Sequence, residues 1–409
     1  MSSLDLADAV NRYSGRLHAA AGDGHHVVSP LGAWMVLALC GPLFEDDPAG
    51  REEMAHLLGA DPVAAAALAS ALLRESHPLV AAGAGLWIRS EYDNRRAQAW
   101  RAALPEQVAT GDIPSQEKLD QWADERTMGL IDRFPIDVTG DVFCLLATAL
   151  ATKVSWEVPF QVVDADRLDQ WHWPQALTRV LETPPDPRHQ QFITQPTPIG
   201  PLAVHLTSAR GGLLVGSVIA ADISAPAKRV LEEAERIVAA EARQTATTPR
   251  QSLFDLPLGD GPVWTVTEEP GAGRHPSERT ERYTTILPAW SAHTKVDLTG
   301  EDLGFGSAAA TIAKAWGLKT WFYEAAQSAM ARYSAEGFEA AAISALHVAL
   351  AAHRWPDATP RRATIRFTHP YAVVAVAYDD PRQASPSAWH GVPVFSAWVT
   401  RPEDAVPAA

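Results

Sequence analysis

The most informative stretch lies late in the chain, where Ser334–Ala352 reads S-A-E-G-F-E-A-A-A-I-S-A-L-H-V-A-L-A-A. As a helix it scores well, because Ala and Leu are strong helix formers and four residues share one side: Phe338, Ala342, Ala345 and Ala349. As a strand it also works, since alternate residues from Phe338 to Leu350 fall on one face. After Gly337 it contains neither Gly nor Pro, and most residues are small enough to slot between strands. The segment therefore suits two structures, and taken alone it would be read as an amphipathic helix.

The composition of the whole chain excludes some classes of protein. The chain has 409 residues, 47% of them apolar, and a formal charge of −15. Nucleic acids and anionic membranes bind proteins through clustered Lys and Arg. The negative charge of this chain therefore argues against both kinds of partner. No run approaches the roughly 20 apolar residues of a membrane span. A single large α+β domain over residues 1–409 fits the length, with no linker or repeat to divide it.

Signatures of catalysis and metal binding are missing from the sequence. There is no His-Glu-x-x-His, Cys-x-x-Cys, Gly-x-Ser-x-Gly, Walker or dinucleotide glycine pattern. The adjacent pair His25-His26 diverges if extended, so it does not chelate a metal on one face. Cys40 and Cys144 each sit in an apolar run, which favours two buried thiols over a disulfide. We therefore expect no catalytic residue, no metal and no cofactor.

The periodicity of apolar residues predicts alternating helices and strands. Helices are expected over residues 4–21, from Ser29-Pro30 through 39, and over 51–58, 62–73, 116–131 and 226–243. Strands are expected over residues 81–89, 141–156, 263–267, 283–296, 319–333, 363–376 and 392–399, with a strand pair around Gly211-Gly212 within 202–220. Residues 161–200 and 245–282 give poor patterns.

Six segments, in order, resemble the serpin family. The run Glu336-Gly337-Phe338-Glu339-Ala340-Ala341-Ala342 resembles the serpin hinge, in which Glu-Gly-Thr-Glu precedes an alanine tract. The other segments are Val28-Ser29-Pro30-Leu31, Trp122 to Ile131, Lys153 to Phe160, Leu287-Pro288 with Val296-Asp297-Leu298, and Phe367-Thr368-His369-Pro370-Tyr371 followed by Val394 to Pro402. Each match is weak alone, but together their order and spacing cover nearly the whole chain. The resemblance is to a divergent, bacterial-type serpin.

This resemblance implies a fold and a mechanism. Serpins are α+β, with three β-sheets, eight or nine helices and an exposed reactive-centre loop, here about residues 335–366. A serine protease cleaves the loop and becomes acylated, and the loop then inserts into the main sheet as a new strand. The native fold leaves strand pairing unmade, and cleavage releases that stored free energy. Such a protein acts as a suicide substrate, as a monomer, and is not an enzyme.

The resemblance also locates the reactive bond. Counting seventeen residues from the start of the hinge at Ala335 places the bond at Ala351-Ala352. Small residues there suit an elastase-like or subtilisin-like protease, whereas Leu350-Ala351 would suit a chymotrypsin-like one. Arg354-Trp355 would suit a trypsin-like protease only with a loop three residues longer before the cut.

Three features depart from the family pattern: one hinge residue, a charged pair and the sheet gate. Phe338 stands where the hinge has Thr, and a bulky ring in a close-packed sheet typically costs about 1–3 kcal/mol unless a hollow receives it. Ala335 and Ala289 replace a charged pair at the top of the sheet. The sheet gate, which in the family is a bonded Ser, Asn and His, aligns here with Ser29, Thr148 and Gln327, whose side chains can bond one another. The fourth gate residue is Trp156, which the resemblance places beneath the top of the sheet in a packing role.

Two functions remain open. The first is an inhibitor of a serine protease, and the second is a non-inhibitory serpin acting as a binding or carrier protein, which Phe338 and the long loop would suit. Met1 to Arg16 lacks the basic start and apolar core of a signal peptide, which predicts a cytoplasmic protein. An extracellular location is the alternative, because it is common in the family.

Overall fold

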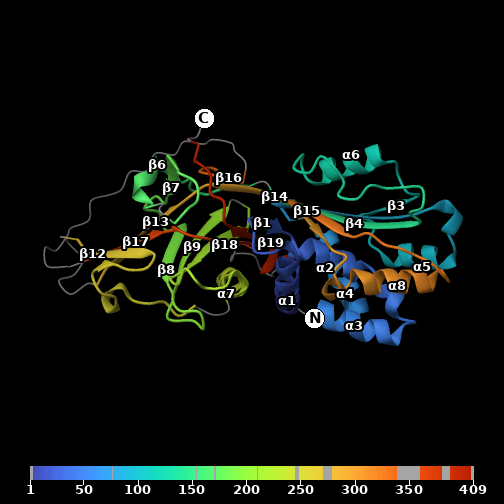
Figure 1. Cartoon of the computed structure of the whole chain (residues 1–409). Coiled ribbons are helices and arrows are strands. Elements are labelled where there is room, and N and C mark those ends of the chain that lie inside the picture. The colour runs from blue at the N-terminus through green and yellow to red at the C-terminus, as the bar shows by residue number, and fades with distance from the viewer. Residues whose placement is uncertain are drawn as a thin grey trace.

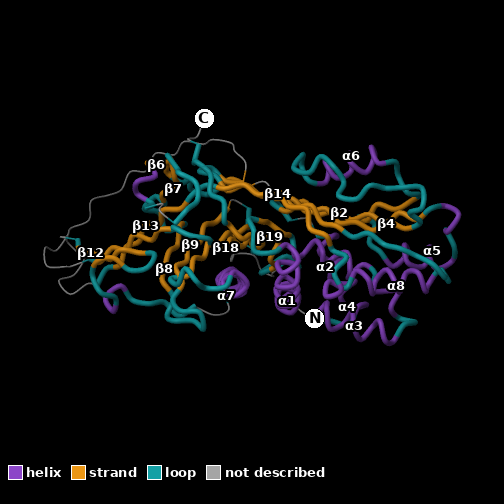
Figure 2. Tube along the Cα trace, viewed as in Figure 1, coloured by secondary structure: helices purple, strands orange, loops and turns teal. Residues whose placement is uncertain are grey.

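The computed structural model describes residues 3–75, 77–152, 154–169, 172–209, 211–244, 248–269, 279–338, 360–379 and 387–406. Two six-stranded sheets gather at one end of the molecule, and most helices gather at the other (Figure 1). The long strands β14 and β15 run between these two ends. The trace in Figure 2 shows helices beneath the strands β2 and β4, with α6 alone on the opposite face.

Eight α-helices are present in the described residues. They are α1 Ser3–Ala21, α2 Pro30–Leu39, α3 Pro48–Leu58, α4 Pro62–Arg74, α5 Arg95–Ala103, α6 Gln116–Arg126, α7 Ala227–Arg243 and α8 Phe305–Ala315. All six predicted helices are confirmed, while α5 and α8 were not predicted. No described helix is by itself long and apolar enough to cross a membrane; α3 and α4 meet that test only as a pair, bent by 49°.

The helix α2 forms as its sequence predicts and is buried almost throughout. The hydroxyl of Ser29 caps it by accepting a hydrogen bond from the Gly32 amide, and Pro30 occupies the first turn. By contrast, α6 ends at Arg126, five residues before the predicted end. Met128 and Gly129 both adopt positive φ angles there, which stops the helix.

One six-stranded sheet is antiparallel throughout. Its order is β1 (His26–Val28), β19 (Val392–Val399), β18 (Tyr371–Ala377), β10 (Leu213–Ala220), β9 (Leu202–Ala209) and β8 (His189–Ile193). The predicted strand pair is the hairpin β9–β10, which turns at two glycines with φ near 100°, Gly211 and Gly212. The helix α7 covers this sheet.

The second six-stranded sheet has the order β11 (Gly259–Asp260), β12 (Trp264–Glu268), β17 (Arg361–Arg366), β13 (Glu281–Leu287), β7 (Arg179–Glu182) and β6 (Gln161–Asp164). The strands β13 and β17 pair in parallel, and every other pair is antiparallel. Part of this sheet comes from residues whose sequence pattern was poor.

The remaining strands form a split sheet. One part is β3 (Val108–Gly111), β2 (Val80–Ile88) and β4 (Cys144–Thr152); the other is β14 (Trp290–Asp297) with β15 (Ala326–Tyr333). A short pair, β5 (Val154–Ser155) with β16 (Gly337–Phe338), lies at the top. Among the described residues no backbone bridge joins β4 to β15. The predicted α+β architecture is confirmed, with the third sheet divided into these parts.

Three predicted strands were wrong in extent. Residues 283–296 form β13 and β14 in two different sheets, because the chain breaks at Pro288, which has no amide to donate. Residues 363–376 are likewise divided into β17 and β18 by the segment ending at Pro370. In the stretch from Lys319, strand structure begins only at Ala326. The long apolar run from Asp141 is a strand, as predicted, over β4 and β5.

Candidate functional site

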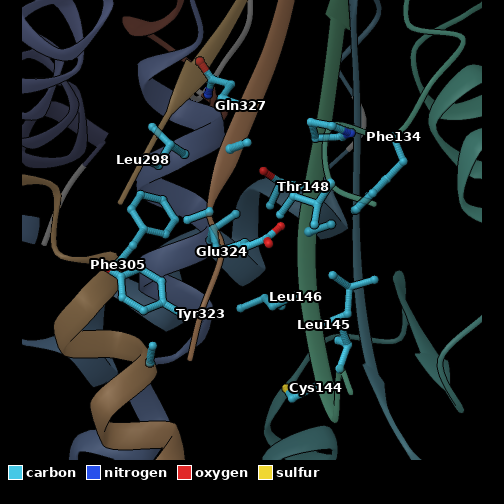
Figure 3. Close-up of a pocket in the computed structure, with 18 of the residues that line it drawn as sticks. Phe134, Cys144, Leu145, Leu146, Thr148, Leu298, Phe305, Tyr323, Glu324 and Gln327 are labelled. Atoms are coloured by element: carbon cyan, nitrogen blue, oxygen red, sulfur yellow. The ribbon is translucent and has the colours of Figure 1, made fainter. Parts of the chain in front are cut away.

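An apolar cleft of about 370 Å³ separates β4 from β15. Thr148 and Leu146 lie on the β4 side of the cleft, with Phe305 and Tyr323 on the opposite side (Figure 3). The floor comes from α2 and part of the wall from α8. The cleft therefore lies along two strand edges that have no strand partner among the described residues.

The two faces of β4 differ in what they contact. Leu145 and Ala147 pack in a cluster with residues of α6. Leu150 belongs to the main core, and the Thr148 hydroxyl donates a hydrogen bond of 2.8 Å to the Gly32 carbonyl of α2. Even-numbered residues of β4 therefore face α2, and odd-numbered residues face α6.

The hinge begins where β15 ends. After Tyr333 the chain reverses, with the Ser334 amide donating to the Gly337 carbonyl at 3.1 Å. Gly337 then pairs with Ser155, and Phe338 pairs with Val154, in an antiparallel ladder. The Glu336 carbonyl extends the same ladder by accepting from the Trp156 amide at 2.9 Å. The first hinge residues thus already form a short strand at the top of the cleft.

Two hinge residues have particular local environments. Gly337 has a φ of 148°, a conformation that residues with a Cβ rarely adopt, so this position requires glycine. Glu336 is buried, and its Oε1 has no hydrogen-bond partner in the described part of the chain. Ala335 is buried as well, and its carbonyl accepts from the Phe160 amide at 2.8 Å.

The sheet gate converges on α2, but not through the expected bonds between its side chains. Gln327 of β15 bonds the backbone of Ser29: its Oε1 accepts from the Ser29 amide at 2.9 Å, and its Nε2 donates to the Ser29 carbonyl at 2.8 Å. The Ser29 hydroxyl donates to the Val394 carbonyl instead. The prediction that the three side chains bond one another is therefore wrong, because each reaches a nearby backbone group.

Gly32 marks the point where the gate residues meet. A Cβ at this position would lie 3.2 Å from Ser29 Oγ, 3.3 Å from Leu150 Cδ1 and 3.5 Å from Gln327 Nε2. The first two distances are tighter than usual packing, and the third is an ordinary contact, so a side chain at this position would require its neighbours to shift slightly. The edges of β4 and β15 are therefore both held against α2, one through Thr148 and the other through Gln327.

Trp156 lies beneath the top of the sheet, where the sequence placed it. It is buried, and its indole N–H donates to the Ser334 carbonyl at 3.0 Å. Its ring lies 5.1 Å from that of Tyr333 and 6.0 Å from that of Phe160. Trp156 thus fixes the turn that leads into the hinge, in addition to its expected packing role.

A buried histidine pair supports the same region. His189 Nε2 lies 2.8 Å from the Val158 carbonyl, so this nitrogen must donate, and His189 Nδ1 then accepts from His205 Nε2 at 3.0 Å. His205 Nδ1 is left without a partner among the described residues. Burial lowers the pKa of both rings, that of His205 well below the usual value. Both rings pack against Phe160, so a neutral pair supports the segment whose Phe160 amide bonds Ala335.

Sequence reasoning missed this pair, because its members are sixteen residues apart on strands whose pairing was not predicted. They come together only through the antiparallel hairpin of β8 and β9. The sequence holds no short motif that could have indicated this contact.

Several predicted site residues lie outside the described part of the chain. These are the later hinge residues Glu339, Ala340, Ala341 and Ala342, and the reactive bond Ala351-Ala352. Within the described residues, no cluster of His, Cys, Asp and Glu is suited to a metal ion. Both cysteines are free, as expected, and burial raises the pKa of the Cys40 thiol to about 12.

Comparisons with known proteins identify the fold. No protein-family model and no curated protein sequence matches the chain. Among solved structures, Serpin48 from the insect Tenebrio molitor has a TM-score of 0.60 at 15% identity, covering 98% of this chain and 100% of its own. The thermophilic serpin tengpin in its native state has a TM-score of 0.65 at 10% identity, and the match covers 97% of this chain and 93% of tengpin. Human thyroxine-binding globulin complexed with thyroxine has a TM-score of 0.60 at 12% identity, covering 98% of each chain.

These neighbours include serpins with different activities, at identities too low to carry an activity across. What they share with this chain is the arrangement of helices and sheets over nearly the full length. The chain therefore has the serpin fold.

Proposed function

We propose that the protein inhibits a serine protease by trapping it, with the segment after Phe338 inserting between β4 and β15 once the loop is cut. The observation that carries this proposal is the pairing of Gly337 with Ser155 and of Phe338 with Val154 at the top of an open cleft. A strand has started there, and the edges of β4 and β15 that would continue it have no strand partner within the described part of the chain.

The register of that short ladder supports the proposal. Continued downward, the same register would bring Ala342 opposite Leu150, Ser344 opposite Thr148 and Leu346 opposite Leu146. Directly opposite residues of an antiparallel pair share a face, so these three would face α2 and the main core. The face that carries Phe338, Leu346, Val348 and Leu350 is the apolar one, as insertion requires. Ser344 would then meet the gate residue Thr148.

The bulk of Phe338 was the main argument against insertion. Its backbone already lies in the ladder beside Val154, so this residue does not need to enter the sheet during the reaction. The residues that follow Phe338 in the sequence are mostly small. Small side chains favour rapid pairing with β4 and β15, because they fit over the close-packed α2 beneath the cleft.

In this mechanism the protein supplies bait and stored strain but no catalytic group, so it is not an enzyme. The protease forms an ester with the carbonyl of Ala351 and releases Ala352 as the new amino terminus. An elastase-like or subtilisin-like enzyme fits two small residues at the bond. Insertion then carries the acylated protease along the sheet before water can hydrolyse the ester.

The test is to incubate the full chain with elastase, subtilisin, chymotrypsin and trypsin, and to run a denaturing gel. A band that is stable in denaturant, at the summed mass of protein and protease, would support trapping. The mass of the released carboxy-terminal fragment identifies the bond. Clean cleavage by all four proteases without a complex would contradict the proposal.

Two matched variants separate insertion from recognition. Ser344→Arg places a charge on the face that would meet α2, whereas Ala358→Arg places the same charge beyond the proposed cut. Ser344→Arg should abolish the complex and leave cleavage intact, and Ala358→Arg should leave both intact. Equal loss in both variants would count against insertion as the cause.

The alternative is a binding or carrier protein without inhibition. The open apolar cleft is the observation that favours it, since a space of this size can also hold a ligand. For this function, all four proteases would give clean cleavage, and the melting temperature would not rise after cutting.

A further inference from the structure

The charged residues that line the cleft are all of one sign. They are Asp137, Asp141 and Glu324, and none of the described residues lining the cleft is a Lys, Arg or His. Asp137 pairs with Arg133, but Glu324 makes no ion pair or hydrogen bond within the described residues. In Figure 3 the Glu324 carboxylate extends from the β15 side toward Thr148. Glu324 is solvent-exposed, so an unpaired carboxylate borders a mainly apolar space.

Aromatic rings line the same cleft as Glu324. Phe305 and Tyr323 line the cleft, and Trp321 and Phe322 line its edge with exposed rings. The ring of Trp321 lies 6.1 Å from that of Tyr323. The faces of such rings attract cations, and the volume of about 370 Å³ lies within the range of small-molecule sites.

From this combination we infer that the cleft binds a small apolar organic cation, an amine whose ring or chain packs between β4 and β15 and whose ammonium group pairs with Glu324. The apolar walls would bury the hydrocarbon part. The unpaired carboxylate of Glu324 would select a positive charge and reject a carboxylate of the same size.

Binding itself does not depend on the proposed inhibitory function, but its consequence does. A ligand in the cleft would occupy the space beside Leu146 and Thr148 that the inserting strand needs. If the protein traps proteases, the bound amine should therefore lower the yield of covalent complex and increase turnover as an ordinary substrate. The ligand would regulate the same site.

A pair of probes with one ring system and opposite charge tests the inference. The probes are 2-(1-naphthyl)ethylamine and 1-naphthaleneacetate, titrated into the full chain and followed by isothermal calorimetry. The amine should bind at least about tenfold more tightly than the carboxylate, which corresponds to about 1.4 kcal/mol. Equal affinities, or binding of neither probe, would overturn the inference.

Two variants locate the site. Glu324→Gln should weaken binding of the amine about tenfold, because it removes a charge-assisted contact. Glu106→Gln changes an exposed acid outside the cleft and should leave the affinity unchanged. An effect of equal size in both variants would show general attraction to an acidic protein and would overturn the specific site.

The gel assay for protease complexes is independent, so failure of inhibition and failure of amine binding are distinguishable.

Discussion

The antiparallel six-stranded sheet and the split sheet are built from similar residues but differ in how their strands are paired. In the first, β10 is bonded on both sides, to β9 along eight residues and to β18 along six. In the second, β4 is bonded along nine residues to β2 on one side and faces the cleft on the other. Both strands are mainly apolar, so hydrophobicity alone does not explain the difference. Among the described residues, no strand bridges β4 and β15 across the cleft.

The same comparison shows what keeps the split sheet open. Thr148 ties the edge of β4 to Gly32, and Gln327 ties the edge of β15 to Ser29, so both edges are anchored on the first turn of α2. Because α2 is buried on nearly every side, it can act as a fixed floor. The sheet can then remain parted without collapse of the core.

The largest expected effect is on thermal stability after cleavage. A strand of about ten residues that bonds both edges adds roughly 10 kcal/mol, at about 1 kcal/mol per hydrogen bond. This should raise the melting temperature by about 15 °C or more in calorimetry of the protein cut near Ala351. The strands of the antiparallel six-stranded sheet are already paired, so the gain in stability should come from the split sheet. Cleaved Ser344→Arg is the control and should gain far less.

Low pH should destabilise the protein through buried histidines in or next to the antiparallel six-stranded sheet. His26, His205 and His369 belong to it or adjoin it, and burial lowers the pKa of each, to about 4 for His26 and His369. An unfolded histidine has a pKa of about 6.5, so below that pH the unfolded chain binds more protons than the folded one. Stability is therefore complete above about pH 6.5 and falls toward pH 4, by up to roughly 3 kcal/mol for each histidine.

Urea unfolding between pH 7 and pH 4 measures this loss. His369→Gln should reduce the dependence on pH, and the exposed control His56→Gln should leave it unchanged. A stability that stays flat over this range in the unmodified protein would contradict the assignment of neutral buried histidines.

A smaller effect is expected at the gate. Gln327→Ala removes the partner of the Ser29 amide and leaves the Ser29 carbonyl bonded only to the Ala33 amide. This should destabilise the native protein by about 1–3 kcal/mol. The neighbouring Ser328→Ala removes only an exposed contact with His293 and should change stability by less than about 0.5 kcal/mol. Equal losses in the two variants would mean that Gln327 does not anchor β15 to α2.

The smallest effect is expected at Thr148. Thr148→Val keeps the shape of the side chain and removes its bond to the Gly32 carbonyl, so stability should fall by about 0.5–1.5 kcal/mol. Because β4 is then less firmly held, insertion after cleavage should also become faster in stopped-flow fluorescence. No change in stability would show that the bond is not an anchor.

Much of the fold was predictable because local signals agreed with it. Ser29-Pro30 begins α2, Gly211-Gly212 turns the hairpin, and Glu336-Gly337 marks a hinge whose glycine has a φ that other residues avoid. The breaks near Pro288 and Pro370 were missed, because apolar residues continue across them into another sheet.

The candidate site was predictable only in part, since it depends on contacts between distant segments. Alignment of family motifs gave Gln327 and Thr148, but their partners are backbone groups of α2, which carry no signal in the sequence. The meeting of His189 with His205, and of Glu324 with an apolar cleft, likewise follows from strand packing.

Hydrogen exchange of the β4 and β15 amides, before and after the loop is cut, tests the missing strand most directly. If the loop segment inserts, peptides covering Cys144–Thr152 and Ala326–Tyr333 should exchange at least about a hundredfold more slowly in the cut protein, equivalent to about 3 kcal/mol of added protection. Peptides from β9 and β10 should keep their rates. Unchanged exchange in β4 and β15 after complete cleavage would contradict the account.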